Sequence, residues 1–172
     1  FSALADTSAV PLIVYDIPYR TGAVIARETL LALAAHPNIR AVKDCGGDAG
    51  KTLALIRDGR LQVLAGEDAQ IFATVAQGGA GAIAASAHLH TQRFVELLEA
   101  LAASDLARAR RAWLPLPPLI EALFAEPNPG PLKAVLAAQG WCSPELRAPM
   151  SRASHDAASR ACAVSESLIA KS

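Results

Sequence analysis

Hydrophobic and polar positions along the first hundred residues follow two patterns in turn. Apolar runs of four or five residues, rich in strand-forming side chains, lie at 11–15, 39–43, 61–65 and 82–85. Each run is followed by a turn and then by apolar residues at helical spacing, in the stretches 30–34, 51–57, 69–77 and 91–102. These short, mainly apolar segments predict four buried parallel strands in successive strand–helix units.

Turn and capping residues separate the units. Gly46-Gly47-Asp48 and Gly66-Glu67-Asp68 follow the second and third runs. Asp48, Thr91 and a carboxylate in the turn 66–68 carry oxygens that can accept hydrogen bonds from the first turn of a helix, so we expect helix caps there. The segment 78–81, which contains three glycines, is expected to end the third helix.

After residue 104 the alternation ends. Helices are predicted over 105–113, 119–124 and 131–139, interrupted by prolines. From Pro149 the sequence turns to Ser, Ala and Arg, which predicts a loosely attached helix or a frayed tail. The expected division is therefore strand–helix units in 1–103, a helical region in 104–150 and a weakly defined tail in 151–172.

The chain begins with Phe1 inside a segment that resembles the last turns of an amphipathic helix. We therefore expect that a beginning is missing. Repeated strand–helix units imply a parallel sheet, but four units fit an open doubly wound sheet and part of a closed barrel equally well.

Composition narrows the class of partner. The chain is 52% hydrophobic and 19% charged, with 16 basic and 16 acidic residues that are not clustered. It lacks the basic surface expected for nucleic acid or an anionic membrane, so we expect a small-molecule partner. Three irregularly spaced cysteines argue against a disulfide framework or a structural zinc site. With no apolar run long enough to span a bilayer and no signal-peptide pattern, the expected location is the cytoplasm.

Lys43 and Tyr15 hold the positions where parallel α/β proteins bind ligands, the carboxyl ends of strands. An amine that is partly removed from water loses its proton more easily and can attack a carbonyl carbon. The phenol of Tyr15 could relay protons for it. A lysine that points to solvent and a tyrosine that covers the sheet are equally compatible with the sequence.

Arg20 lies in a loop stiffened by Pro18 and Gly22, where its guanidinium could hold a carboxylate or simply form a surface ion pair. Cys45 is expected to be buried and inert. The glycines of 78–81 precede a strand, in the opposite order to a dinucleotide-binding loop. His88 and His90 have no acidic partner at metal-ligand spacing and are expected to be structural.

Together these motifs resemble the dihydrodipicolinate synthase family. The segments that carry the resemblance, in colinear order, are 15–22 (Tyr-Asp-Ile-Pro-Tyr-Arg-Thr-Gly), 42–44 (Val-Lys-Asp) with Gly47-Asp48, 65–68 (Ala-Gly-Glu-Asp), 78–83 (Gly-Gly-Ala-Gly-Ala-Ile), and 126–129 (Glu-Pro-Asn-Pro) with Lys133. The resemblance covers roughly the first 150 residues. The Arg20-Thr21-Gly22 motif favours the synthases over the related sialic acid lyases.

The resemblance implies a TIM (β/α)8 barrel of class I aldolase type, with only the last four strand–helix units present, plus a C-terminal helical extension. It implies that Lys43 forms an imine with pyruvate and needs no other cofactor or metal, while Tyr15 shuttles protons. Arg20 and Thr21 would bind the carboxylate of aspartate semialdehyde. Gly66, Glu67 and the backbone carbonyl of Ile83 would support the site.

The family's threonine pair, its second tyrosine and its lysine-inhibition residues lie in the upstream half of its barrel, which this sequence does not contain. We therefore expect a poor catalyst from this chain alone, and the family's homotetramer only with the full barrel. Two other functions remain open. One is a lyase for N-acetylneuraminate or another 2-keto-3-deoxy sugar acid, and the other is a non-catalytic half-barrel that pairs its open edges.

Overall fold

The computed structural model describes residues 1–169. Contacts group the chain into two units, residues 1–84 and residues 85 onward, here called the N-terminal and C-terminal units. Each has its own hydrophobic core. The predicted three-part division concerns which elements belong to a barrel, and it stays a prediction.

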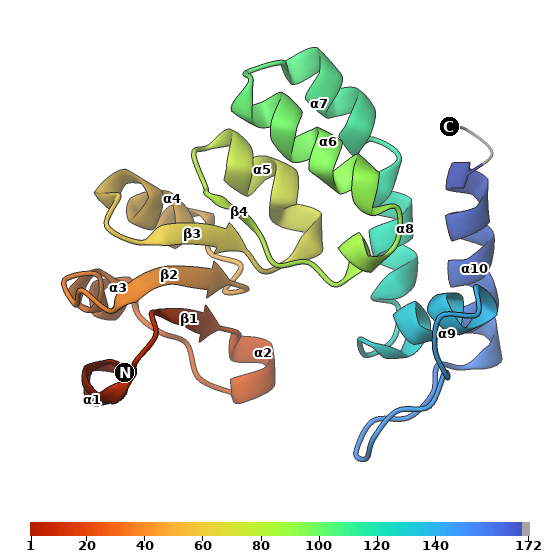
Figure 1. Ribbon diagram of the computed structural model, residues 1–172, viewed down its shortest axis with the longest axis horizontal. Helices are drawn as coiled ribbons and strands as arrows, with labels where there is room; N and C mark the ends of the chain where they lie inside the picture. Colours follow the sequence, from red (N-terminus) through yellow and green to blue (C-terminus); the bar gives the residue numbers. More distant parts are fainter. Residues whose placement is uncertain (170–172) are drawn as a thin grey trace. The chain divides into compact units, whose positions relative to one another are not determined.

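The N-terminal unit is a parallel four-stranded sheet with strand order β1-β2-β3-β4, as the sequence predicts. Figure 1 shows β1, β2 and β3 side by side in chain order. Its elements are α1 (Ser2–Thr7), β1 (Leu12–Asp16), α2 (Pro18–Thr21), α3 (Arg27–Leu33), β2 (Ile39–Asp44), α4 (Ala49–Asp58), β3 (Gln62–Ala65), the 3-10 turn η1 (Asp68–Gln70), α5 (Ile71–Ala76) and β4 (Gly81–Ala82).

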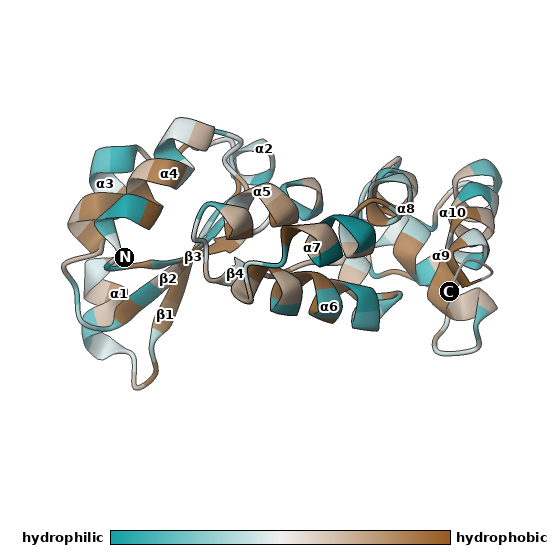
Figure 2. Ribbon diagram, turned by 90° about the horizontal axis from the view of Figure 1, so that it is seen from above, coloured by the Kyte–Doolittle hydropathy of each residue, from teal (hydrophilic) through white to brown (hydrophobic). Residues whose placement is uncertain are grey.

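One face of the sheet packs on helices. Val14, Val42 and Val63 stand at paired positions of β1, β2 and β3 and are buried with Leu30 of α3 and Leu55 of α4. Figure 2 shows α3 and α4 together on one side of these strands. Alternation along each strand sends the intervening side chains to the opposite face.

That opposite face is open in part. Ile13 and Tyr15 on β1 are 52% and 45% exposed, although both are large and apolar. Lys43 is half-buried at the position of β2 that pairs with Tyr15. The carboxyl ends of the strands therefore bring the two predicted reactive side chains to one face.

Several local predictions need correction. The fourth strand spans only Gly81–Ala82, not 82–85, because it pairs on one side with the last two residues of β3. Asp48 caps α4 as predicted, accepting from the Lys51 amide at 3.0 Å. In the turn 66–68, Glu67 holds the N-cap position of η1 without a side-chain cap hydrogen bond, and Asp68 is the first residue of η1.

The C-terminal unit is helical. It consists of the 3-10 turn η2 (Ser86–His88), α6 (Thr91–Ala102), α7 (Leu106–Trp113), α8 (Leu116–Leu123), α9 (Gly130–Ala138) and α10 (His155–Ile169). Figure 1 shows α6 and α7 as a side-by-side pair. The N-cap of α6 is His90, in a left-handed conformation, rather than the predicted Thr91. Helix α8 begins before the predicted residue 119, because a proline in the first turn sacrifices no intrahelical hydrogen bond.

Helix α10 occupies most of the region where the sequence predicts a loose helix or frayed tail. It packs on α8 and α9 and buries Ala157, Ala161, Ser165 and Leu168. These four residues recur at intervals of four, four and three, which places them on one face of a helix. No helix within residues 1–169 is long and apolar enough to cross a membrane.

Candidate functional site

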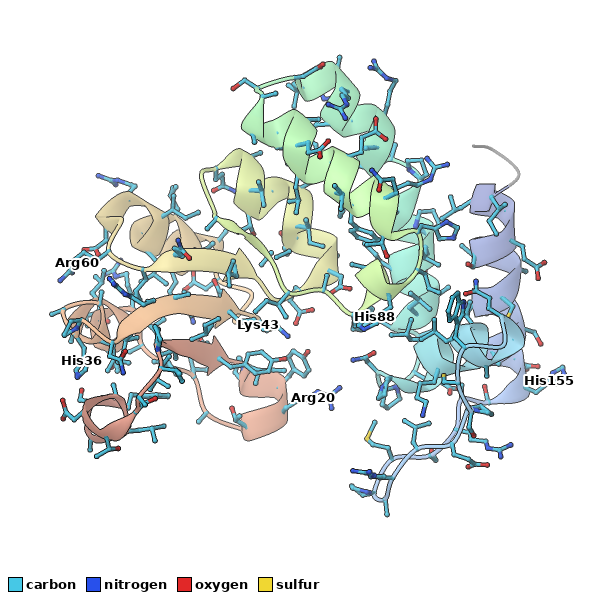
Figure 3. The ribbon with its side chains drawn as sticks, viewed as in Figure 1. Arg20, His36, Lys43, Arg60, His88 and His155 are labelled. Carbon is cyan, nitrogen blue, oxygen red and sulfur yellow. The ribbon has the colours of Figure 1, made fainter. Side chains whose placement is uncertain are left out.

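Lys43 and Tyr15 form the centre of the candidate site. Because the two residues pair across adjacent parallel strands, their side chains leave the sheet on the same face. The Lys43 Nζ lies 4.2 Å from the centre of the Tyr15 ring. Figure 3 shows Lys43 at the carboxyl end of β2, whereas the labelled His36 and Arg60 lie toward the other end of the strands.

The Tyr15 phenol stays protonated far into the alkaline range. Burial, followed by the neighbouring Cys45, raises the pKa of Tyr15 to about 12. The Cys45 Sγ lies 3.9 Å from the Tyr15 Oη. Burial and the Glu67 carboxylate raise the pKa of the Cys45 thiol to about 12 as well, so the structure agrees with an inert cysteine. Near neutral pH, Tyr15 can thus donate a proton or pass one on.

Gly66 lets the next strand end approach Lys43 closely. Its amide donates to the Asp44 carbonyl at 2.9 Å, which continues the ladder beyond β3. A Cβ added at Gly66 would stand 2.9 Å from both the Lys43 Cγ and the Asp44 carbonyl oxygen, closer than real Cβ contacts. A glycine is therefore required for Lys43 to pack against this turn.

Arg20 and Thr21 lie on α2, a single helical turn that replaces the predicted loop. Pro18 starts this turn, and Gly22 ends it in a left-handed conformation with φ +68°, donating to the Pro18 carbonyl at 2.8 Å. The Thr21 hydroxyl is used locally, since it donates to the Ile17 carbonyl at 3.0 Å. The Arg20 guanidinium lies 5.9 Å from the Tyr19 ring, and Figure 3 shows Arg20 projecting from α2.

Glu67 and Ile83 lie near the remaining strand ends. Within the described residues, the buried Oε1 of Glu67 has no hydrogen-bond partner. Glu67 also lines a cavity of about 140 Å³ together with Asp44, Thr52, Gln70 and Thr74, among others. The Ile83 amide donates to the Ala65 carbonyl at 2.9 Å, and its side chain is exposed.

Comparison with known proteins shows the family to which this chain belongs. A family model described as the dihydrodipicolinate synthetase family matches residues 1–166, nearly the whole chain. The chain belongs to this family. The 4-hydroxy-tetrahydrodipicolinate synthase of Limosilactobacillus fermentum is 40% identical over 151 residues, which is 87% of this chain and 49% of that protein. The synthase of Exiguobacterium sp. is 42% identical over 144 residues, 82% of this chain and 49% of that protein.

Solved structures of the dihydrodipicolinate synthase family agree on the fold. The synthase from Aquifex aeolicus superposes with a TM-score of 0.93 at 27% identity, covering 98% of this chain and 58% of that one. The Acinetobacter baumannii synthase, solved with pyruvate, gives 0.90 at 28% identity over 96% and 58%. These neighbours and the parallel sheet establish a TIM-barrel-type fold. The chain spans about half the length of the curated relatives it matches.

A buried ionic cluster behind the strand ends was not predicted from the sequence. Asp16 and Asp44, the last residues of β1 and β2, directly follow Tyr15 and Lys43 and are buried on the helix side of the sheet. Asp16 pairs with Lys51 of α4, and Nζ lies 2.5 Å from Oδ2. Alternation along the strands places Asp16 and Asp44 on the covered face. No local sequence pattern predicts that Lys51, 35 residues away, pairs with Asp16.

Metal-ligand residues do not gather in the part of the chain that is described. No group of three or more His, Cys, Asp or Glu side chains there is arranged to hold an ion. His88 and His90, singled out from the sequence, make hydrogen-bond contacts within the C-terminal unit. The His88 ring bonds the Ala85 carbonyl at 2.9 Å, and the His90 Nε2 lies 3.1 Å from the Ser165 hydroxyl.

Proposed function

We propose that this chain carries the pyruvate-binding half of a 4-hydroxy-tetrahydrodipicolinate synthase, a lyase that condenses pyruvate with aspartate semialdehyde. One observation carries the proposal: the Lys43 amine lies 4.2 Å from the Tyr15 ring at the carboxyl ends of paired strands, in a chain of this family. A primary amine beside a protonated phenol is the pair of groups that imine formation requires.

In the proposed reaction the neutral Lys43 nitrogen attacks the carbonyl carbon of pyruvate. The nitrogen gives up one proton and the carbonyl oxygen takes one up, which gives a carbinolamine. A second proton, delivered to the hydroxyl, lets the oxygen leave as water, and the protonated imine remains. Tyr15 would move these protons, because its pKa near 12 keeps the phenol protonated at neutral pH. The imine itself withdraws electrons from the methyl carbon, so the proposed chemistry needs no separate cofactor or metal.

Arg20 and Thr21 would bind the carboxylate of the aldehyde substrate. The guanidinium supplies paired donors that match a carboxylate, and the capped turn of α2 gives it a defined base. Gly66 and Glu67 would shape the floor beside Lys43, and the backbone of Ile83 would lie beside the amine. These assignments follow the family resemblance. The close packing of Gly66 on Lys43 supports the role given to Gly66.

We also propose that the four strand–helix units correspond to the last four of a (β/α)8 barrel. A closed barrel typically takes about 250 residues, and this chain covers only 58% of each of the two matched structures. The upstream threonine pair and second tyrosine of the family would complete the proton relay. Full turnover and the family's homotetramer would then require that half.

The proposal is tested by trapping the imine with borohydride in the presence of pyruvate. Intact mass and peptide mapping should place the reduced adduct on Lys43 and show none in Lys43→Ala. Lys133→Ala is the matched control, because Lys133 lies in the C-terminal unit and contacts the Glu145 carbonyl. An adduct on another lysine, or none in a chain shown to be folded, would contradict the proposal.

The aldehyde substrate is tested separately, because sugar-acid lyases share the lysine chemistry. Added before borohydride, aspartate semialdehyde should consume the unreduced pyruvate imine in the parent chain and so lower the yield of trapped adduct. Arg20→Gln should weaken this effect without abolishing the pyruvate adduct. Preferential reaction with a hydroxylated aldehyde such as N-acetylmannosamine would instead identify a sugar-acid lyase.

A further inference from the structure

The buried ion pair between Asp16 and Lys51 also contacts the backbone of a neighbouring segment. Its side chains are 0% and 4% exposed, although burying either charge alone is costly. Asp16 ends β1 and Lys51 lies in the first turn of α4, so the pair joins a strand end to a helix that follows the next strand. Because burying these two charges is costly, the pair indicates a specific geometry at the strand ends.

Both backbone polar groups of Ile25 bond to this pair. The Ile25 amide donates to the Asp16 Oδ1 at 3.4 Å, and the Lys51 Nζ donates to the Ile25 carbonyl at 3.4 Å. Ile25 ends the segment 17–25, which leaves β1, carries Arg20 on α2 and returns to the sheet before α3. The pair therefore fixes the far end of the segment that bears Arg20, while β1 itself fixes the near end.

The turn after β2 closes over the same pair. A Cβ at Gly46 would stand 2.6 Å from the Lys51 Nζ and 3.1 Å from the Asp16 Oδ2. Asp44 accepts from the Gly46 amide at 2.9 Å and from the Thr52 hydroxyl at 2.5 Å. The strand end that carries Lys43 is thus tied to the helix that supplies Lys51.

We propose that Asp16 and Lys51 are positioning residues, which hold the 17–25 segment in a fixed relation to Lys43 and Tyr15. The part of this inference that concerns substrate rests on the proposed function. The pair does not touch the reacting atoms; it acts through the Ile25 backbone and sets where Arg20 can meet a carboxylate while the amine binds pyruvate.

The first test measures hydrogen exchange in the whole chain. Asp16→Leu/Lys51→Met replaces the pair by apolar groups, a change that buried ion pairs often tolerate. Exchange in 17–25 should accelerate by about tenfold, as expected when a segment loses its anchoring hydrogen bonds, while β2 keeps its protection. The control Asp58→Leu/Arg60→Met removes an exposed pair and should leave 17–25 unchanged.

Unchanged protection of 17–25 in a folded double variant would overturn the inference. If the double variant does not fold, Gly46→Ala replaces it. Gly46 does not have a positive φ, and its added Cβ would displace the end of the Lys51 side chain while keeping both charged residues in the sequence. The same acceleration, of smaller size, is expected, and its absence would count equally against the positioning role.

The second test separates positioning from simple stability. With pyruvate trapping as the readout, the double variant should need about the same pyruvate concentration as the parent. It should need about tenfold more aspartate semialdehyde, added before borohydride, to consume the unreduced imine, a difference that corresponds to about 1.4 kcal/mol. An equal increase in the required concentrations of pyruvate and aspartate semialdehyde would indicate a purely structural role. If the parent chain traps no pyruvate, the proposed function fails, and the exchange experiment alone decides the inference.

Discussion

The two units of this chain differ in the kinds of side chain that they bury. In the N-terminal unit, charged Asp16, Asp44, Lys51 and Asp68 are buried near the carboxyl ends of the strands. In the described part of the C-terminal unit, the buried polar side chains are the uncharged Ser86 and Ser165. Its core is formed by leucine, valine and alanine from α8, α9 and α10. Buried charge therefore accumulates where the candidate chemistry lies.

The aromatic residues provide a separate probe for each unit. Both tyrosines of the sequence, Tyr15 and Tyr19, belong to the N-terminal unit, and both tryptophans, Trp113 and Trp141, belong to the C-terminal unit. Tyrosine absorbance and tryptophan fluorescence thus follow the two units independently during unfolding. The comparison can be tested one unit at a time.

The largest effect is expected from Lys51→Met. It leaves the fully buried Asp16 carboxylate without its cation, and breaking a buried pair in this way typically costs about 3–5 kcal/mol. In urea, the transition followed by tyrosine absorbance should move to lower concentration, while the tryptophan transition stays in place. Equal shifts in both signals would mean that the units unfold together, and the contrast between them would not hold.

A comparable loss from an uncharged contact is expected for Leu119→Ala. Leu119 is 0% exposed in the core between α8, α9 and α10, and such truncations cost about 2–5 kcal/mol. Here the tryptophan transition should move and the tyrosine transition should not. Leu114→Ala, at a residue 70% exposed, is the control and should change neither.

Alkaline titration tests the two tyrosines of the N-terminal unit. Burial raises the pKa of both Tyr15 and Tyr19 from 10.0 to about 12, so the folded unit holds these protons more tightly than the unfolded chain. The resulting stabilisation is complete below pH 10 and is lost as the pH rises through 12. Tyrosinate absorbance should show both midpoints near 12, and Tyr19→Phe isolates Tyr15. Midpoints near 10 in the folded chain would contradict the raised pKa values of both phenols.

The smallest effect is expected in the C-terminal unit on the acid side. Burial, opposed by the Ser165 contact and reinforced by Arg93, lowers the pKa of His90 below 6.5. His90 therefore stabilises the folded unit above the unfolded pKa, and this contribution disappears as the pH falls through the folded pKa. The tryptophan transition should weaken between neutral pH and about pH 5. His90→Asn, which tolerates the left-handed backbone, should remove most of this dependence.

Sequence patterns predicted the parallel sheet because its signals are local. Continuous apolar runs gave β1 to β3, and Asp48 followed by helical spacing gave the start of α4. The weak points were positions where packing overrides such signals. The strand at Gly81–Ala82 is shorter than its apolar run, and α10 buries a stripe of alanine and serine that a search for large apolar residues passes over.

The candidate site was predictable in its strand-end side chains and not in the ion pair behind them. Lys43 and Tyr15 stand out because each ends an apolar run, and register then brings them together. In the sequence, Lys51 has the position of an ordinary polar residue on an amphipathic helix. Its burial follows from a contact with Asp16, which lies 35 residues away in the chain. Long-range pairing of this kind leaves no periodic trace in the sequence.

The open face beside Lys43 has a consequence for the lifetime of any adduct. An imine forms by releasing water, so water that reaches the imine carbon returns it to amine and ketone. With Tyr15 and Ile83 each more than two-fifths exposed, the solvent that admits pyruvate also favours hydrolysis of the product. A surface that covered this face would exclude that water, and its main effect would be to slow the reverse step rather than to accelerate attack.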